Sequence, residues 1–180
     1  VVIDAGHINT DVLVAEGEGL VFHGSLPVGG GTITRDISLL LNLPPDEAEQ
    51  LKRKLVLGMR RGDGMPARRG GHGNIADAQE VAEARVWDMA DQIAAMLQDC
   101  GLSYDMQTGI YLTGGGLAMM RGTKDILSAT LGRIVKPYTH PSPLLGGPAY
   151  TAAAGTLFYA LNVLQKTPVS SIIAWIKDLF

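Results

Sequence analysis

The sequence has little cysteine, and this scarcity excludes several classes of protein. Cys100 is the single cysteine, so the chain forms no internal disulfide and no cysteine-rich metal site. His23, His72 and His140 show no metal-ligand spacing, which argues against a zinc site. A lone thiol suits a reducing compartment, which favours a cytoplasmic location.

The sequence also lacks a large charge of one sign and a long apolar run. Its formal net charge is −3 over 180 residues, so no basic excess points to nucleic acid as a partner. No apolar run approaches the ~20 residues that a membrane span needs. A signal peptide is not recognisable, because the chain starts at Val1 inside a strand-like run without a preceding basic region. We therefore interpret the sequence as the later part of a longer protein.

The sequence contains enough apolar residues to form a hydrophobic core. Hydrophobic residues make up 46% of the sequence, which fits one domain or two small lobes. The first part is typical of an antiparallel meander, with strands at about 1–3, 11–15 and 20–27. A helix is predicted at 33–43, and a second one begins at the prolines of 43–55. We expect Thr32 to cap the first of these helices, whose apolar face is predicted to hold Ile33, Ile37, Leu40 and Leu41.

The second part alternates helices and strands. A helical pattern runs from about Ile75 to Asp99. After it we expect a strand at 109–113, a helix at 120–131, a strand at 133–136 and a helix at 148–164. Two strand–turn–helix units after a meander predict an α/β lobe. The glycine- and arginine-rich stretch 58–74 has no periodicity and is predicted to be a mobile loop.

Three glycine-bearing turns follow predicted strands and carry the candidate chemistry. They are DAGHINTD at 4–11, PVGGGT at 27–32 and LTGGGLAMMRG at 112–122. Glycine permits positive φ angles and close backbone approach, and amides at such turns can hold an anion. None of them has the Walker P-loop pattern or the G-x-G-x-x-G spacing of a dinucleotide fold. Singly each turn is a weak signal, whereas their order along the chain is specific.

These turns and their surroundings resemble the second lobe of the actin-like ATPases, most of all the FtsA family of bacterial division proteins. IDAGHINTDVLV resembles the second phosphate loop, and VAEARVWDMADQI resembles the helix that ends the small subdomain. YLTGGGLAMMRG and GGPAYTAAAGTLFYAL resemble the adenosine loop and the closing helix. SLPVGGGTITRDISLLLNLPPDEAEQLK resembles the stretch that separates FtsA and its pilus relative PilM from actin and the sugar kinases.

The resemblance covers about residues 1–164 and implies a fold. That fold is α/β, a ribonuclease H-like lobe of an actin-like ATPase with a small inserted helical subdomain. Residues 1–58 and 101–165 would form the large subdomain, and 59–100 a reduced small subdomain. Residues 166–180 would form an apolar tail helix.

The resemblance further implies a site for ATP and Mg²⁺ around the first turn. Asp4 would face the metal ion and the phosphates through water, as a hard oxygen ligand does. Gly6 would let the backbone approach the γ-phosphate, and Thr10 and Asp11 would close the loop by hydrogen bonds. The residue pattern alone also allows Asp4 simply to cap a turn.

Further along the chain, the resemblance assigns residues to the nucleoside. Glu49 and Lys52, three positions apart on one helical face, would meet the ribose and the adenine edge. Gly114, Gly115 and Gly116 would pass under the adenosine. The alternative for Glu49 and Lys52 is an ordinary solvated pair on a helix surface.

The first turn departs from the family pattern at three positions. His7 and Ile8 stand where the family often has glycine, and Asn9 stands where it has threonine. The Ile8 side chain cannot hydrogen-bond a phosphate, and two non-glycine residues restrict the backbone there. The family's first phosphate loop and water-activating helix lie in its first lobe, to which nothing here corresponds. We expect half a site, with hydrolysis weak or absent in this chain alone.

The resemblance implies partners as well. An FtsA-like protein would need the missing first lobe, polymerise, and link division filaments to the inner face of the cell membrane. An FtsZ-like acidic tail peptide would bind its small subdomain. The arginines at positions 60, 61, 68 and 69 either bind such a peptide or are simply solvated. The apolar segment 169–180 either binds a membrane surface or packs on the domain or a neighbouring copy.

Two other functions stay open from the sequence. One is a PilM-like scaffold that binds a short peptide and uses nucleotide structurally. The other is a degenerate actin-like interaction module without nucleotide, which His7 and Ile8 favour.

Overall fold

The computed structural model describes residues 1–58, 75–100, 108–138 and 147–166. Within these residues five strands form one mixed sheet in the order β3-β2-β1-β4-β5. The strands are β1 (Val2–Ala5), β2 (Thr10–Glu16), β3 (Gly19–Leu26), β4 (Ile110–Thr113) and β5 (Val135–Pro137). The three-stranded meander is antiparallel, whereas β1 pairs with β4, and β4 with β5, in parallel. The predicted meander followed by strand–helix units is confirmed, and so is the α/β class.

The helices lie close to their predicted ranges. They are α1 (Gly30–Leu41), α2 (Pro45–Lys52), α3 (Ile75–Asp99), α4 (Thr123–Leu131), the 3-10 turn η2 (Pro148–Tyr150) and α5 (Thr151–Lys166). Pro44 and Pro45 begin α2, where a missing N–H has no cost. Asn42 is the C-cap of α1 and Gly132 is the C-cap of α4. Both residues have the left-handed backbone conformation that commonly ends a helix.

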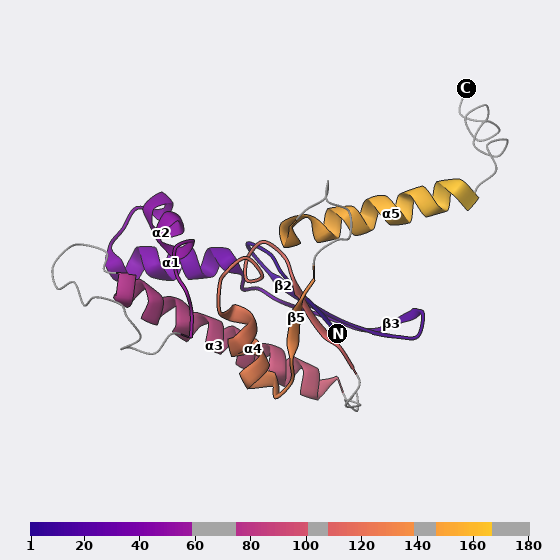
Figure 1. Ribbon diagram of the computed structural model, residues 1–180, viewed down its shortest axis with the longest axis horizontal. Coiled ribbons are helices and arrows are strands. Elements are labelled where there is room, and N and C mark those ends of the chain that lie inside the picture. Colours follow the sequence, from indigo (N-terminus) through magenta and orange to yellow (C-terminus); the bar gives the residue numbers. More distant parts are fainter. Residues whose placement is uncertain (59–74, 101–107, 139–146, 167–180) are drawn as a thin grey trace, which may run out of the picture.

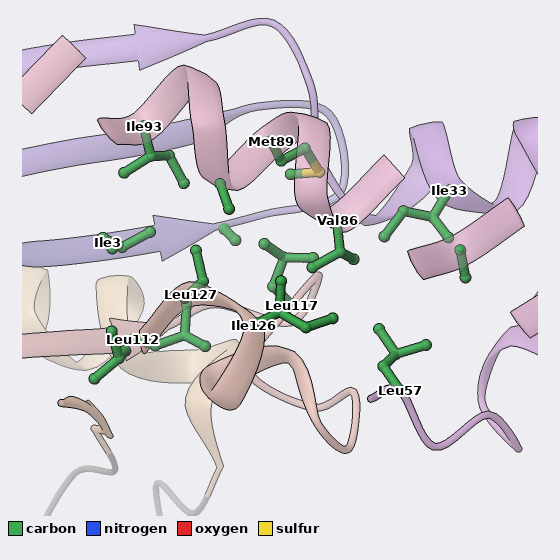
Figure 2. Packing of buried hydrophobic residues seen from close by; sticks show 14 of the residues in the cluster. Ile3, Ile33, Leu57, Val86, Met89, Ile93, Leu112, Leu117, Ile126 and Leu127 are labelled. Atoms are coloured by element: carbon green, nitrogen blue, oxygen red, sulfur yellow. The ribbon is translucent and has the colours of Figure 1, made fainter. Parts of the chain in front are cut away.

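One face of the sheet is packed against helices. α3 contacts both α1 and α4, and its buried side chains share one hydrophobic cluster with those of the strands. Figure 2 shows Ile3 of β1 and Leu112 of β4 in this cluster, with Met89 and Ile93 of α3 and Leu127 of α4. The alternation of side chains along each strand therefore defines a covered face and an opposite face.

The opposite face of the sheet is much more open. Val2 and Tyr111 are exposed there, and Leu13, paired with Val2 in the ladder, is half-buried. Asp4 and Asp11 lie on this same face, at the ends of β1 and β2 that lead into the first glycine turn. Parallel strand pairs are usually covered on both faces, so this face is unusually bare.

Helix α5 contributes little to the core. In Figure 1 it extends away from the sheet. Of its side chains that the structure describes, at positions 151–163, only Ala154 is buried. The same stretch carries no charged residue and exposes Leu157, Phe158 and Leu161. Among the helices of the described residues, none has the length and apolarity to cross a membrane.

Two details of α1 differ from the prediction. The helix begins at Gly30, so Thr32 is not its cap but lies inside the first turn, where its hydroxyl accepts a hydrogen bond from the Gly29 N–H. Leu40 is 70% exposed and does not belong to the apolar face, because α2 and α3 approach α1 from the side of Ile33 and Ile37.

Several predictions fall outside the described residues. These are the arginine-rich stretch 59–74, His140 in the segment 139–146, and the tail 167–180. The division into subdomains at 59–100 stays a prediction, and within the described part the buried side chains of α3 belong to the same cluster as the sheet.

Candidate functional site

The first glycine turn is a tight hairpin between β1 and β2. The Gly6 N–H donates to the Asn9 carbonyl at 2.9 Å, which places His7 and Ile8 at the tip. Neither tip residue has a positive φ, since Asn42 is the only non-glycine residue with one among the described residues. Ile8 is 75% exposed, so its side chain points away from the core.

The three glycine turns meet at this hairpin. The Gly30 N–H donates to the Gly6 carbonyl at 2.9 Å, and the Gly31 N–H donates to the His7 carbonyl at 2.8 Å. From the third turn, the Gly116 N–H donates to the Ala5 carbonyl at 2.7 Å. The turns that the sequence singled out are therefore one structure, and these three amides hold it together instead of facing outward.

Two glycines of the third turn could not be replaced without a shift of backbone. Gly114 has a φ of +89°, and a Cβ atom on it would lie 2.5 Å from Oδ1 of Asp4. A Cβ atom on Gly116 would collide with the carbonyl oxygen of Gly6. Because glycine has no Cβ atom, the turn that follows β4 can pack directly against Asp4.

Asp4 and Asp11 form a pair of like charges on the open face. They are direct ladder partners in β1 and β2. Burial raises the pKa of the Asp4 carboxyl, and the negative charge of Asp11 raises it further. A nearby cation would relieve this repulsion, so the environment of Asp4 favours binding of positive charge.

Thr10 and Asp11 tie the start of β2 to its surroundings. Thr10 is completely buried, and its hydroxyl donates to the carbonyl of Val28, in the second glycine turn, at 2.8 Å. Asp11 accepts a hydrogen bond of 2.8 Å from Nδ2 of Asn9 and lies 3.4 Å from Nε2 of His23.

Glu49 and Lys52 form a network with the first turn of α1. Lys52 is only 6% exposed, and its Nζ lies 2.9 Å from the Gly30 carbonyl, 2.8 Å from Oγ1 of Thr34 and 2.6 Å from Oε2 of Glu49. Oε1 of Glu49 accepts a further bond of 2.9 Å from Nε of Arg53. The alternative of a solvated surface pair is wrong, because the lysine is buried against α1.

This network controls the ionisation of Glu49. Burial by itself raises the pKa of the carboxyl, but hydrogen bonds from Lys52, Thr34 and Arg53 outweigh burial and lower the pKa from 4.5 to about 2. A carboxyl whose folded pKa is depressed stabilises the protein above its unfolded pKa, and this stabilisation is lost as the pH falls through the folded pKa.

We therefore expect acid to weaken the protein through Glu49 between about pH 4.5 and about pH 2. Urea denaturation of the wild type and of Glu49→Gln, measured across this range, checks it. The variant should be less stable at neutral pH, and the two free energies of unfolding should converge near pH 2. Curves that stay parallel would show that the Glu49 network does not contribute this pH dependence.

The donor set around Asp4 fits only part of a metal site. No group of three or more His, Cys, Asp or Glu residues that could hold a metal ion occurs in the described residues. A single half-buried carboxylate suits a hard cation that keeps its waters and takes further oxygen ligands from phosphates. Asp4 is thus compatible with Mg²⁺ that arrives with a nucleotide, and the described residues alone do not complete a metal site.

Sequence reasoning missed a groove between α1 and α3. Its volume is about 610 Å³. Arg85 lines it and donates from Nε to Asp36 at 2.6 Å and from Nη1 to Asp88 at 2.8 Å. The other lining residues are Leu40, Asp77, Glu80, Val81 and Ala84. The available signal was the spacing of Arg85 and Asp88 on one helical face, beside an apolar Leu40.

Comparison with known proteins agrees with this architecture. The family model described as "Cell division protein FtsA" matches residues 1–155. FtsA of Helicobacter pylori (strain ATCC 700392 / 26695) is 28% identical over a match that covers 69% of this chain and 28% of the relative. FtsA of Escherichia coli (strain K12) is 26% identical over 99% of this chain and 49% of the relative. The chain thus spans half or less of the length of these relatives.

Solved structures that resemble this one have the actin-like fold. MreB5 of Spiroplasma citri bound to ADP superposes with a TM-score of 0.70 and 16% identity, over 92% of this chain and 55% of that one. The PilM-PilN type IV pilus biogenesis complex gives a TM-score of 0.61 and 23% identity, over 86% and 43% of the chains. At these identities the likeness establishes the fold alone, an actin-like ATPase lobe. Since the family model spans most of the sequence, this chain belongs to the FtsA family of cell division proteins.

Proposed function

We propose that this chain is the second-lobe half of an ATP-binding division protein that links division filaments to the membrane. Mg²⁺–ATP would bind between this lobe and a first lobe. The observation that supports the proposal is the convergence of three glycine turns beside Asp4 on the open face of the sheet. Phosphoryl groups require positioning and charge, which such a sparse set of residues can supply.

Within this proposal the residues have distinct roles. Asp4 would hold the waters of the metal ion. The amides of His7 and Ile8, which make no hydrogen bond within the described residues, would face the phosphates. Gly115, in the middle of the third turn, would lie under the adenosine, and the carboxylate of Glu49 would lie towards the ribose. Weak or absent hydrolysis by this chain alone stays a prediction.

The bare surfaces support the need for a first lobe. Val2 and Tyr111 on the open sheet face, and Leu157 and Phe158 on α5, are exposed apolar side chains. Apolar surface of this kind usually marks an interface. A first lobe that covers it would also shield Asp4 and supply the remaining phosphate contacts.

Calorimetric titration with Mg²⁺–ATP tests this proposal. The chain alone and the chain joined to a first lobe are compared, each with Asp4→Asn as a variant. We expect binding only with both lobes and with Asp4 intact. Micromolar affinity of the lone chain would contradict the half-site proposal, and no binding by either form would favour the nucleotide-free interaction module.

Asp4→Asn, which should abolish nucleotide binding, is expected to increase the stability of the protein. Because the pKa of Asp4 is raised in the folded protein, its carboxylate destabilises the fold at neutral pH without ligand. We expect Asp4→Asn to raise the melting temperature at pH 7 without Mg²⁺–ATP, and the gain to shrink as acid protonates the wild-type carboxyl. Calorimetric scans at pH 7 and at an acidic pH check this, and a variant less stable than the wild type at pH 7 would contradict it.

The α1–α3 groove favours a second candidate function, that of a peptide-binding scaffold. Asp36 and Asp88 flank Arg85, so the groove is more negative than positive. It suits a peptide that offers an apolar side chain to Leu40 together with a basic group, so an acidic FtsZ-like tail would be a poor ligand for this groove. Anisotropy of a labelled peptide with one apolar and one basic side chain tests this: Leu40→Ala should weaken its binding. Binding without filament formation would favour the scaffold over the filament protein.

A further inference from the structure

Lys52 joins helix α2 to the glycine turns. The family resemblance directs this lysine to the ribose and the adenine edge, but its ammonium group points into the protein. It reaches the carbonyl of Gly30 at 2.9 Å, in the second glycine turn. Only 6% of the residue is exposed, so a ligand has little access to it.

The hydrogen-bonding capacity of the ammonium group is already used. An ammonium has three N–H donors. The three acceptors within reach are the Gly30 carbonyl, Oγ1 of Thr34 at 2.8 Å and Oε2 of Glu49 at 2.6 Å. Lys52 therefore has no N–H left for a ribose hydroxyl or an adenine nitrogen.

The peptide held by Lys52 is the one on which the other turns rest. The N–H of Gly30 donates to the Gly6 carbonyl, and a Cβ atom on Gly30 would lie 2.7 Å from the Cα atom of Gly116. The next amide, of Gly31, donates to the His7 carbonyl. A displacement of Gly30 would thus move the hairpin tip and the third turn together.

We propose that Lys52 is a positioning residue, which fixes Gly30 and through it the hairpin of residues 6–9, and does not contact the nucleoside. Its charge holds the carbonyl that begins α1, and Glu49 neutralises that charge in the same place. The role in positioning is independent of nucleotide, whereas its consequence for phosphate binding rests on the proposed function.

The first experiment needs no ligand. Backbone amide exchange is measured by NMR on the wild type, on Lys52→Met, and on Lys54→Met as the exposed control in the turn that follows the same helix. We expect the Gly30 and Gly31 amides to exchange about tenfold faster in Lys52→Met, because a charge-assisted bond next to them is lost. Amides of α4 should be unchanged. Unchanged exchange at Gly30 would overturn the proposal.

The second experiment separates positioning from direct contact. Affinities for Mg²⁺–ATP and for Mg²⁺–tripolyphosphate are measured on the two-lobe protein. If Lys52 acts through the hairpin, Lys52→Met weakens both ligands by the same factor. Loss of ATP affinity alone would reveal a nucleoside contact and overturn the proposal.

Two further outcomes remain decisive. A wild type that binds neither ligand would refute the proposed nucleotide function, and the exchange measurement alone then decides the role of Lys52. If Lys52→Met does not fold, Thr34→Val replaces it, since this variant removes one of the three acceptors. The Gly30 amide must then still exchange faster than in the wild type, or the proposal fails.

Discussion

Gly116→Ala is expected to lower the free energy of unfolding by about 3 kcal/mol. The new Cβ atom would collide with the carbonyl oxygen of Gly6 and lie 2.8 Å from that of Ala5. Both obstacles are backbone atoms, so no rotation of a side chain can make room. The variant would lose the hydrogen bond from the Gly116 N–H to the Ala5 carbonyl, which joins the first and third turns.

Gly115→Ala is the matched control for this prediction. A Cβ atom on Gly115 would lie 3.7 Å from the Cα atom of Ala149, an ordinary contact distance, and 3.2 Å from its Cβ atom. A shift of a few tenths of an ångström relieves that contact, so the expected cost is below about 1 kcal/mol. Urea denaturation of both variants compares them directly, and equal losses would show that the crowding at Gly116 does not matter.

Ile3→Ala is expected to cost about 4 kcal/mol, the upper part of the range for truncation of a buried aliphatic side chain. Ile3 is 0% exposed, in the central strand of the sheet, and Figure 2 shows it among the helix side chains of the cluster. The surrounding strands are held by ladders on both sides, so the cavity cannot close easily. Equilibrium unfolding in urea measures the loss.

Val2→Ala serves as the control, because Val2 is the next residue but points to the opposite face. It is 37% exposed and should cost less than about 1 kcal/mol. A large cost at Val2 would mean that the open face is covered in solution, which would contradict the exposure of Val2 and Tyr111 in the structure.

The elements of this fold were predictable because strong local signals delimit them. Pro44 and Pro45 begin α2, glycines end the strands, and the apolar periodicity of α3 is unbroken from Ile75 to Asp99. The resemblance placed the first and third turns in one site, whereas the second turn served only to separate the FtsA and PilM families from their relatives. Its contact with the first turn was not predicted.

Long-range contacts were not predictable from local patterns. Leu40 and Leu41 look alike in the sequence, and only the approach of neighbouring helices decides that Leu40 is exposed. The burial of Lys52 depends on a carbonyl 22 residues away, at Gly30. For the same reason, nothing in the sequence indicated that the amides of the glycine turns bind one another.

The position of β1 at the centre of the sheet has a consequence for the rate of folding. β2 and β3 follow β1 closely in the chain, so their hairpins can form early. The other edge of β1 cannot pair until β4 is available, because Ile3 pairs with Leu112. Helices α1, α2 and α3 lie between these two strands in the sequence. Non-local parallel pairing of this kind slows folding, because the loop must close before any contact stabilises it. During synthesis, the unpaired edge of β1 would therefore stay available to other strands until β4 emerges from the ribosome.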